Sequence, residues 1–156
     1  MTGTPVGEFA LASDGAAICA ARFGEIPMRA STDSDALLDA AVAQITAYFR
    51  GERTDFDLPL VVTGGSEFER AVWEQLRLIP YGRTMTYGEV AAAVGERGAA
   101  RAVGVACNRN PLPLVVPCHR VMGAGGKLVG FGGGIPAKVA LLELELRVAV
   151  ESGLGI

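Results

Sequence analysis

The apolar positions at the start of the chain follow first a strand period and then a helix period. Residues 9–12 and 16–23 are two apolar-rich runs joined by Asp14-Gly15, a pair typical of a hairpin turn. From Ser34, a residue suited to cap a helix, to Phe49, apolar side chains recur at helical spacing. Residues 56–62 are a further apolar run, which predicts a third strand at a sheet edge because of Pro59. Residues 1–62 are therefore expected to form a small α/β scaffold domain, an antiparallel sheet plus a helix.

After a Thr63-Gly64-Gly65 linker the pattern changes to short helices, which predicts a second domain over residues 66–156. Ser66-x-x-Glu69 and Thr86-x-x-Glu89 are capping-box patterns, and each predicts the start of a helix. The second of these helices is expected to end at about Val94, before a glycine-containing break.

A further helix is expected from Ala99 to about Asn108. Two short helices joined by such a turn are typical of a helix-turn-helix, and equally of an ordinary helical hairpin. The side chains of the second helix are nearly all small, with Arg101 as the one long cation. Such a helix could approach a DNA backbone or a narrow groove closely, or it could be buried against a neighbour with Arg101 at the rim. The pattern alone leaves both interpretations open.

Composition narrows the class of protein. No apolar run is long enough to span a bilayer, and residues 1–9 lack the basic start and apolar centre of a signal peptide, which predicts a cytoplasmic protein without a membrane partner. Three cysteines then favour free thiols, and a single histidine argues against a zinc site, so neither a metal nor a cofactor is expected.

The net charge of −3 conceals an asymmetry along the chain. Residues 1–60 carry a net charge of −5, whereas residues 77–127 carry a net charge of +5. A basic second half fits a protein that neutralises DNA phosphates, although a chance excess of surface arginine would give the same count.

The candidate chemistry lies at Cys118 and His119, after an apolar run that we take as a buried strand. The thiolate is the reactive form of cysteine, and the only histidine of the chain could act as its base. Consecutive side chains of a strand point to opposite faces, so a helical turn or a bridging water would be needed between the two. The alternative interpretation is an inert core thiol.

Two further features follow the cysteine. Residues 123–134 contain seven glycines, which would let the backbone approach a flat ligand, or would form only a hairpin tip. Residues 136–148 have the pattern of an amphipathic helix, from which Glu145 could reach back to orient the histidine or could simply face solvent.

Pro117-Cys118-His119-Arg120-Val121 resembles the active-site motif of the O6-alkylguanine-DNA alkyltransferases, also called methylated-DNA–protein-cysteine methyltransferases. Other matches occur at the spacing of that family: Ile79-Pro80-Tyr81-Gly82, Thr86-Tyr87-Gly88-Glu89, Ala100-Arg101-Ala102-Val103-Gly104, Asn110-Pro111, and Leu141-Leu142 followed by Glu145. The resemblance is close from residue 66 onwards and loose before it. An ordered series is far more specific than a single five-residue motif. It implies an α/β N-terminal module followed by a mostly α C-terminal domain with a winged helix-turn-helix.

The resemblance also implies a reaction. Cys118 would take a methyl or larger alkyl group from O6-alkylguanine, and the resemblance leaves open whether it also takes one from O4-alkylthymine. The thioether formed is too stable to hydrolyse at so simple a site, so one molecule would repair one lesion and then be spent. By the same resemblance, His119 would deprotonate Cys118 through a water molecule and Glu145 would orient His119. Tyr87 would hydrogen-bond the guanine and help to rotate the nucleotide.

The remaining roles concern the extruded base. Main-chain groups at Cys118 and Val121 would hold its exocyclic amine, and the N–H near Gly132 would meet O6. Phe131, where many relatives have tyrosine, would form an apolar wall.

On the DNA side, the resemblance implies a monomer that binds the minor groove of double-stranded DNA. Arg101 would fill the gap left by the flipped base. The small residues that would approach the groove are Ala99, Ala100, Ala102 and Gly104. Asn110 would support the structure by tying the helix-turn-helix to the active-site segment.

Three other functions fit parts of the pattern. A non-catalytic sensor of alkylated DNA would flip the base without forming an adduct, although relatives of that kind carry another residue at the position of Cys118. A thiol hydrolase would turn over repeatedly. A plain helix-turn-helix regulator would bind DNA without needing the thiol.

Overall fold

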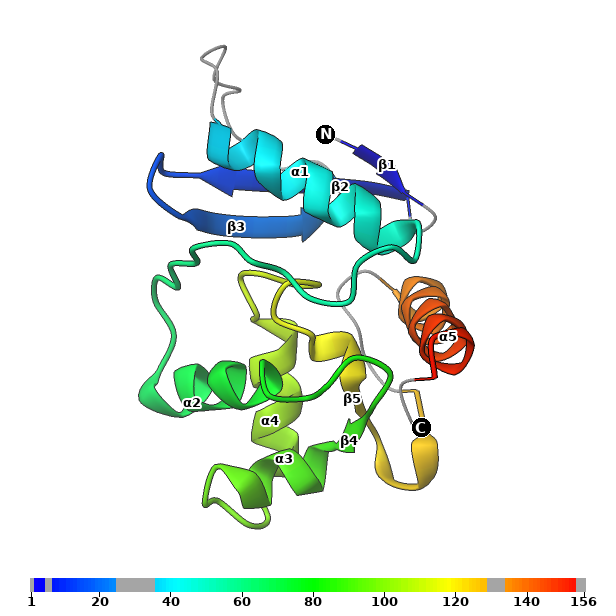
Figure 1. The fold of residues 1–156 in the computed structure, drawn as a ribbon. Helices are drawn as coiled ribbons and strands as arrows, with labels where there is room; N and C mark the ends of the chain where they lie inside the picture. Colours follow the sequence, from blue (N-terminus) through cyan, green and yellow to red (C-terminus); the bar gives the residue numbers. More distant parts are fainter. Residues whose placement is uncertain (1, 5–6, 25–35, 129–133, 154–156) are drawn as a thin grey trace.

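The N-terminal part of the molecule is one helix packed on a three-stranded antiparallel sheet (Figure 1). The computed structural model describes residues 2–4, 7–24, 36–128 and 134–153. The elements of this part are β1 (Thr2–Thr4), β2 (Gly7–Ser13), β3 (Ile18–Phe23) and α1 (Ala36–Phe49). The sheet order is β1-β2-β3, and the side chain of Asp14 caps the turn between β2 and β3. The predicted hairpin and helix are therefore confirmed, whereas Ser34 lies outside the described residues.

The predicted third strand over residues 56–62 is wrong. This segment makes one isolated parallel bridge, in which the Ile18 N–H donates to the Pro59 carbonyl at 2.8 Å and the Val61 N–H donates to the Ile18 carbonyl at 3.0 Å. Proline has no N–H to extend the ladder, so the pairing stops there. The third strand of the sheet is instead β1, whose three residues are too few to show a period in the sequence.

The C-terminal part is mostly helical. Its helices are α2 (Glu67–Leu76), α3 (Tyr87–Ala93), α4 (Ala100–Asn108) and α5 (Ile135–Glu151). Short elements connect them, namely β4 (Met85–Thr86), β5 (Val121–Met122) and the 3-10 turns Cys118–Arg120 and Ala124–Gly126. The two strands pair in parallel and flank the helix-turn-helix formed by α3 and α4.

Both predicted capping boxes are present. At the start of α2, Ser66 and Glu69 exchange side-chain-to-backbone hydrogen bonds of 3.0 Å, and Thr86 and Glu89 do the same at the start of α3. Each box satisfies two backbone N–H groups that a helix leaves unpaired at its N-terminus. The local sequence therefore fixes where these two helices begin.

Trp73 joins α2 to α4. Its buried indole N–H donates to the carbonyl of Ala106 at 2.7 Å. Gly65 lies over the same ring with a φ of +80°, and a Cβ at that position would approach the ring carbons of Trp73 to 2.5 Å. The linker therefore requires glycine there both for its backbone conformation and for its close approach to Trp73.

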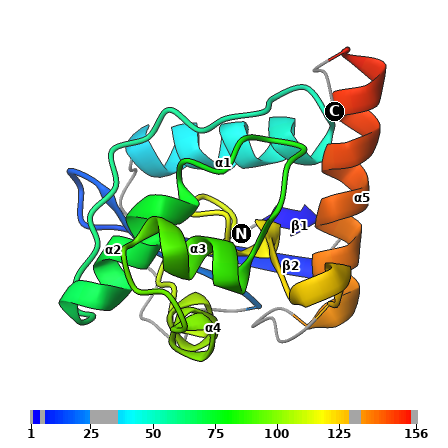
Figure 2. The same ribbon diagram turned by 90° about the horizontal axis from the view of Figure 1, so that it is seen from below.

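One apolar core runs through both parts of the molecule, from Phe9 and Ile18 in the sheet to Leu141 and Leu144 in α5. The segment after α1 passes between the sheet and the helices, and α5 stands along one side (Figure 1). Seen from below, α3 and α4 lie on the near side of the molecule, with α1 behind them (Figure 2). The helix-turn-helix thus forms the end opposite the N-terminal sheet.

Candidate active site

The backbone before Cys118 is a tight turn. The apolar run that we took as a buried strand makes only an isolated bridge between Pro113 and Val116, and Leu114 lies in the left-handed region with a φ of 75°. A non-glycine residue there is held by its surroundings at a cost of about 1–3 kcal/mol. The 3-10 turn Cys118–Arg120 follows directly. The adjacent side chains of Cys118 and His119 therefore lie in a helical turn and do not alternate between the two faces of a strand.

Cys118 is buried, with 5% of its surface exposed. Burial raises the pKa of its thiol, and the side chain of Asn110 and the charge of Lys138 offset this in part. The resting sulfur is accordingly a protonated thiol that needs a base to become a nucleophile.

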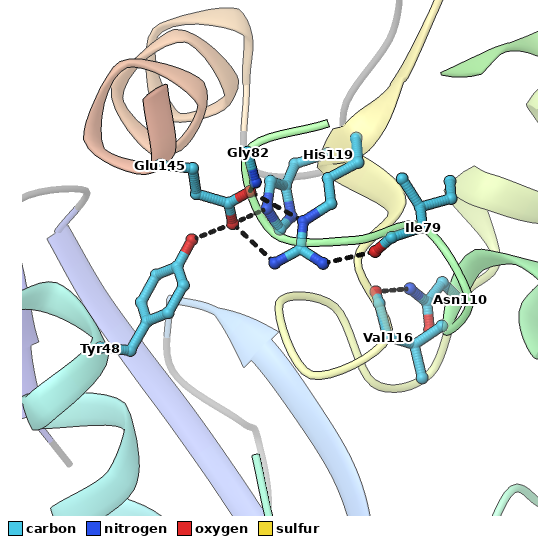
Figure 3. A network of polar contacts seen from close by, with 8 residues as sticks. Tyr48, Ile79, Gly82, Asn110, Val116, His119 and Glu145 are labelled. Carbon is cyan, nitrogen blue, oxygen red and sulfur yellow. Dashed lines mark hydrogen bonds and ion pairs between the residues drawn. The ribbon is translucent and has the colours of Figure 1, made fainter. Parts of the chain in front are cut away.

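The carboxylate of Glu145 accepts hydrogen bonds from three parts of the chain (Figure 3). His119 Nε2 lies 2.7 Å from Oε2, and the Tyr48 hydroxyl donates to the same oxygen at 2.5 Å. Arg120 donates through Nε to Oε1 at 2.8 Å and through an Nη2 to Oε2 at 3.0 Å. The Gly82 N–H completes the set at 3.5 Å from Oε1. Three donors therefore reach Oε2 and two reach Oε1, so both oxygens of the carboxylate are fully engaged.

These contacts determine the protonation states of Glu145 and His119. Burial by itself would raise the pKa of Glu145, but His119 and Arg120 outweigh it and lower the pKa to about 2. Burial, together with the charges of Arg120 and Lys138, lowers the pKa of His119 by more than Glu145 raises it, so the imidazole is neutral at pH 7. Because an ionised carboxylate only accepts hydrogen bonds, His119 donates from Nε2 and leaves a free lone pair on Nδ1. His119 Nδ1 is buried and has no hydrogen-bond partner among the described residues.

Arg120 anchors the network to the rest of the domain. The residue is buried, and its guanidinium donates through Nη1 to the carbonyl of Ile79 at 2.8 Å and lies 5.5 Å from the ring centroid of Tyr81. The bidentate pair with Glu145 places compensating charges side by side in the interior.

Asn110 connects the end of α4 to the turn before Cys118. Its amide donates to the carbonyl of Val116 at 2.8 Å and its oxygen accepts from the Leu112 N–H at 2.9 Å. Both bonds are buried, as expected for a residue that holds two segments together.

Tyr87 is the first residue of α3 and faces both the thiols and the surface. Burial and the nearby thiols of Cys107 and Cys118 raise the pKa of Tyr87 to about 12. Tyr87 also borders a cavity of about 490 Å³, which Arg101, Gly104 and Asn108 line from α4. Cys118 is not among the described residues that line this cavity.

The predicted DNA-binding residues cluster at the start of α4. Arg101 and Ala102 are exposed, and Ala99, Ala100 and Gly104 are half-buried. Ala100, Arg101 and Gly104 line the cavity. The small residues therefore lie partly at the surface, which separates this helix from the fully buried alternative.

The predicted substrate-binding residues are described only in part. Val121 is buried in β5, and its carbonyl accepts a hydrogen bond from the buried Lys138 Nζ at 2.5 Å. Phe131 and Gly132 lie outside the described residues. Within those residues, no group of three or more histidine, cysteine, aspartate or glutamate side chains could hold a metal ion, and no helix is long and apolar enough to cross a membrane.

Comparison with known proteins agrees with this architecture. Residues 67–147 match the model of the 6-O-methylguanine DNA methyltransferase DNA-binding domain, and residues 1–62 match that of its ribonuclease-like domain. The chain belongs to the methylated-DNA–protein-cysteine methyltransferase family. A family member from Mycobacterium tuberculosis is 47% identical over 146 residues, which are 91% of this chain and 88% of the relative. One from Mycolicibacterium paratuberculosis is 54% identical over 116 residues, 74% of this chain and 70% of the relative.

Solved structures of the family have the same fold. A crystal structure of Mycobacterium tuberculosis OGT in complex with DNA superposes with a TM-score of 0.86 at 47% identity, covering 94% of this chain and 91% of that one. An O6-methylguanine DNA methyltransferase from Methanococcus jannaschii gives a TM-score of 0.63 at 28% identity, covering 88% and 87%. The predicted family and fold class, an α/β domain followed by a mostly helical DNA-binding domain, are confirmed.

The sequence predicted Cys118, His119 and Glu145 as one site. In the structure, Cys118 and His119 lie in one 3-10 turn, and His119 hydrogen-bonds to Glu145. Tyr48, Arg120 and Lys138 were not predicted as members of the site. Arg120 stands within the quoted motif, so its position was a usable signal. Nothing in the pattern of α1 separates Tyr48 from an ordinary core residue.

Proposed function

We propose that this protein repairs O6-alkylguanine in duplex DNA by transferring the alkyl group irreversibly to Cys118. The observation that carries the proposal is the buried His119, which directly follows Cys118 in the 3-10 turn and whose Nε2 is held by Glu145 while its Nδ1 has no hydrogen-bond partner among the described residues. Family membership supports the reaction, and the helix-turn-helix supports DNA as the partner.

The transfer begins with the proton of Cys118. His119 Nδ1 accepts it through a bridging water, and Glu145 stabilises the imidazolium that forms. The thiolate attacks the alkyl carbon, a C–S bond forms and the bond between that carbon and O6 breaks. The electron pair stays on guanine, which regains one proton at N1, so the proton lost by Cys118 balances the reaction.

The base must leave the DNA stack for this attack, because a buried thiol cannot reach O6 inside a duplex. We propose that Arg101 fills the gap left by the base and that the small residues of α4 contact the minor groove closely. Tyr87, which borders both the cavity and the thiol region, is assigned to the guanine ring. The main chain at Val121 is assigned to the exocyclic amine, since a carbonyl that accepts from Lys138 keeps a second lone pair.

Phe131 and Gly132 keep the roles expected from the resemblance, an apolar wall and a donor to O6. We further propose that the protein acts as a monomer in the cytoplasm, where its thiol stays reduced. The domain boundary is proposed at residues 63–65, supported by the positive φ angles of Gly64 and Gly65.

A stoichiometry measurement tests the proposal. Increasing protein is incubated with excess duplex DNA that contains O6-methylguanine, and the repaired guanine is counted. We expect repair to stop at one guanine per protein molecule, because the thioether is not regenerated. Repeated turnover would contradict the transfer mechanism and favour a hydrolase, and DNA binding without repair would favour a sensor.

A further inference from the structure

We infer that Tyr48, a residue of the N-terminal domain, is a positioning residue for the reaction: its hydroxyl holds the Glu145 carboxylate in the orientation that His119 requires. The two residues are 97 positions apart in sequence and are joined by one buried hydrogen bond of 2.5 Å. The inference rests on the proposed role of His119 as the base for Cys118.

The hydrogen bond from the Tyr48 hydroxyl reaches one particular oxygen of the Glu145 carboxylate. Tyr48 and His119 share the same oxygen, Oε2, so the tyrosine directly affects the atom that orients the imidazole (Figure 3). Burial, followed by the charge of Glu145, raises the pKa of Tyr48 well above its ordinary value, so the hydroxyl stays a donor at every relevant pH.

The tyrosine ring is itself fixed. It is fully buried, and its centroid lies 5.3 Å from that of Phe49, 5.4 Å from that of Phe56 and 6.1 Å from that of Tyr81. A ring held by three aromatic neighbours presents its hydroxyl in one place, and little entropy is lost when the hydrogen bond forms. The scaffold domain thereby contributes a polar group to chemistry that otherwise lies in the C-terminal domain.

Removing the Tyr48 hydroxyl is expected to change both the pKa of His119 and the orientation of the Glu145 carboxylate. Without the hydroxyl, Oε2 becomes a stronger base and stabilises the imidazolium of His119 more, so the pKa of His119 rises. The other charged groups that act on His119, namely Glu145 and Lys138 from α5 and Arg120 from its own turn, are unchanged, as is the neighbouring thiol of Cys118. The freed carboxylate also samples orientations that misplace the imidazole, which slows proton removal.

The test compares Tyr48→Phe with Tyr81→Phe. The Tyr81 hydroxyl is buried and has no hydrogen-bond partner among the described residues, so its removal controls for the loss of a buried oxygen near the same carboxylate. We expect Tyr48→Phe to slow methyl transfer about tenfold, the effect of losing one hydrogen bond to a charged group. We also expect it to move the acid limb of the rate profile to higher pH, whereas Tyr81→Phe leaves both unchanged.

NMR gives a readout that needs no substrate, because His119 is the only histidine and its ring signals are unambiguous. The pKa of His119 should rise in Tyr48→Phe and not in Tyr81→Phe. An unchanged His119 titration, or a slower rate with an unchanged acid limb, would overturn the positioning role and leave a structural one.

In the unsubstituted protein, a slowly exchanging Tyr48 hydroxyl proton should show a nuclear Overhauser effect to the His119 Nε2 proton. Absence of this contact would overturn the inference even if Tyr48→Phe failed to fold. Absence of repair in the unsubstituted protein would contradict the proposed function alone, since the titration measures the network without DNA.

Discussion

At the scale of single residues, His119 and Glu145 work as a pair whose charges are set by burial. Glu145 is ionised because Arg120 and His119 surround it, and His119 is neutral because the interior disfavours a second cation beside Arg120. A neutral imidazole that donates from Nε2 is the state able to accept a proton at Nδ1. The same two shifts couple the stability of the protein to pH.

We expect the free energy of unfolding to fall as the pH drops from about 6 to about 2. The pKa of Glu145 is about 2 when folded against an ordinary 4.5, so its contribution, about 3 kcal/mol, is complete above pH 4.5 and is lost below it. The lowered pKa of His119 acts in the same direction below about pH 6.5, because the unfolded chain binds that proton more readily. Urea denaturation across this pH range measures both effects.

Glu145→Gln is the matched variant for this prediction. It removes the titrating group and leaves the buried guanidinium of Arg120 without its counter-charge, so the variant should be less stable at pH 7 by about 3–5 kcal/mol. Its stability should then vary less between pH 5 and pH 2. A pH dependence equal to that of the unsubstituted protein would contradict the assigned protonation state of Glu145.

At the scale of elements, the small side chains of α4 distinguish it from an ordinary packed helix. Gly104 is the test position, since it lies inside the helix and a Cβ there would come no closer than 3.9 Å to Tyr87 Cε1, an ordinary contact. Nothing in the packing of the described residues therefore requires glycine, and glycine costs a helix interior about 1 kcal/mol relative to alanine.

Gly104→Ala should raise the urea midpoint and slow repair of duplex DNA, because the added methyl group lies on the surface assigned to the minor groove. Reaction with free O6-benzylguanine serves as the control, since that substrate needs no contact with a DNA backbone. Arg101→Ala should show the same selective loss on duplex DNA. Equal losses on both substrates in either variant would contradict the DNA-facing role of α4.

The elements also show where sequence reasoning succeeds. Ser66 and Thr86 predict the starts of α2 and α3 correctly, because a capping box is a local interaction within four consecutive residues. Residues 56–62 do not form the predicted strand, and β1 was not predicted. Strand pairing depends on partners distant in sequence, which a short apolar run does not reveal. The tight turn at Leu114 is likewise set by its surroundings and not by its side chain.

At the scale of the whole molecule, both domains contribute side chains to the hydrogen bonds of one carboxylate, that of Glu145. Cys118, His119 and Glu145 could be predicted from the sequence because motif and spacing carry them. The Tyr48 hydroxyl could not, because an aromatic residue on the apolar face of a helix has the same pattern whether or not its oxygen has a partner. Only the packing of α1 near α5 turns Tyr48 into a part of the site (Figure 3).

The most direct test of the account is to locate the transferred group. The protein is incubated with duplex DNA containing O6-methylguanine, digested, and mapped by peptide mass spectrometry, with His119→Gln as the matched variant. We predict one methyl group on Cys118, none on Cys19 or Cys107, and much slower labelling in the variant. A methyl group on another residue, or repaired DNA with an unmodified Cys118, would contradict the account.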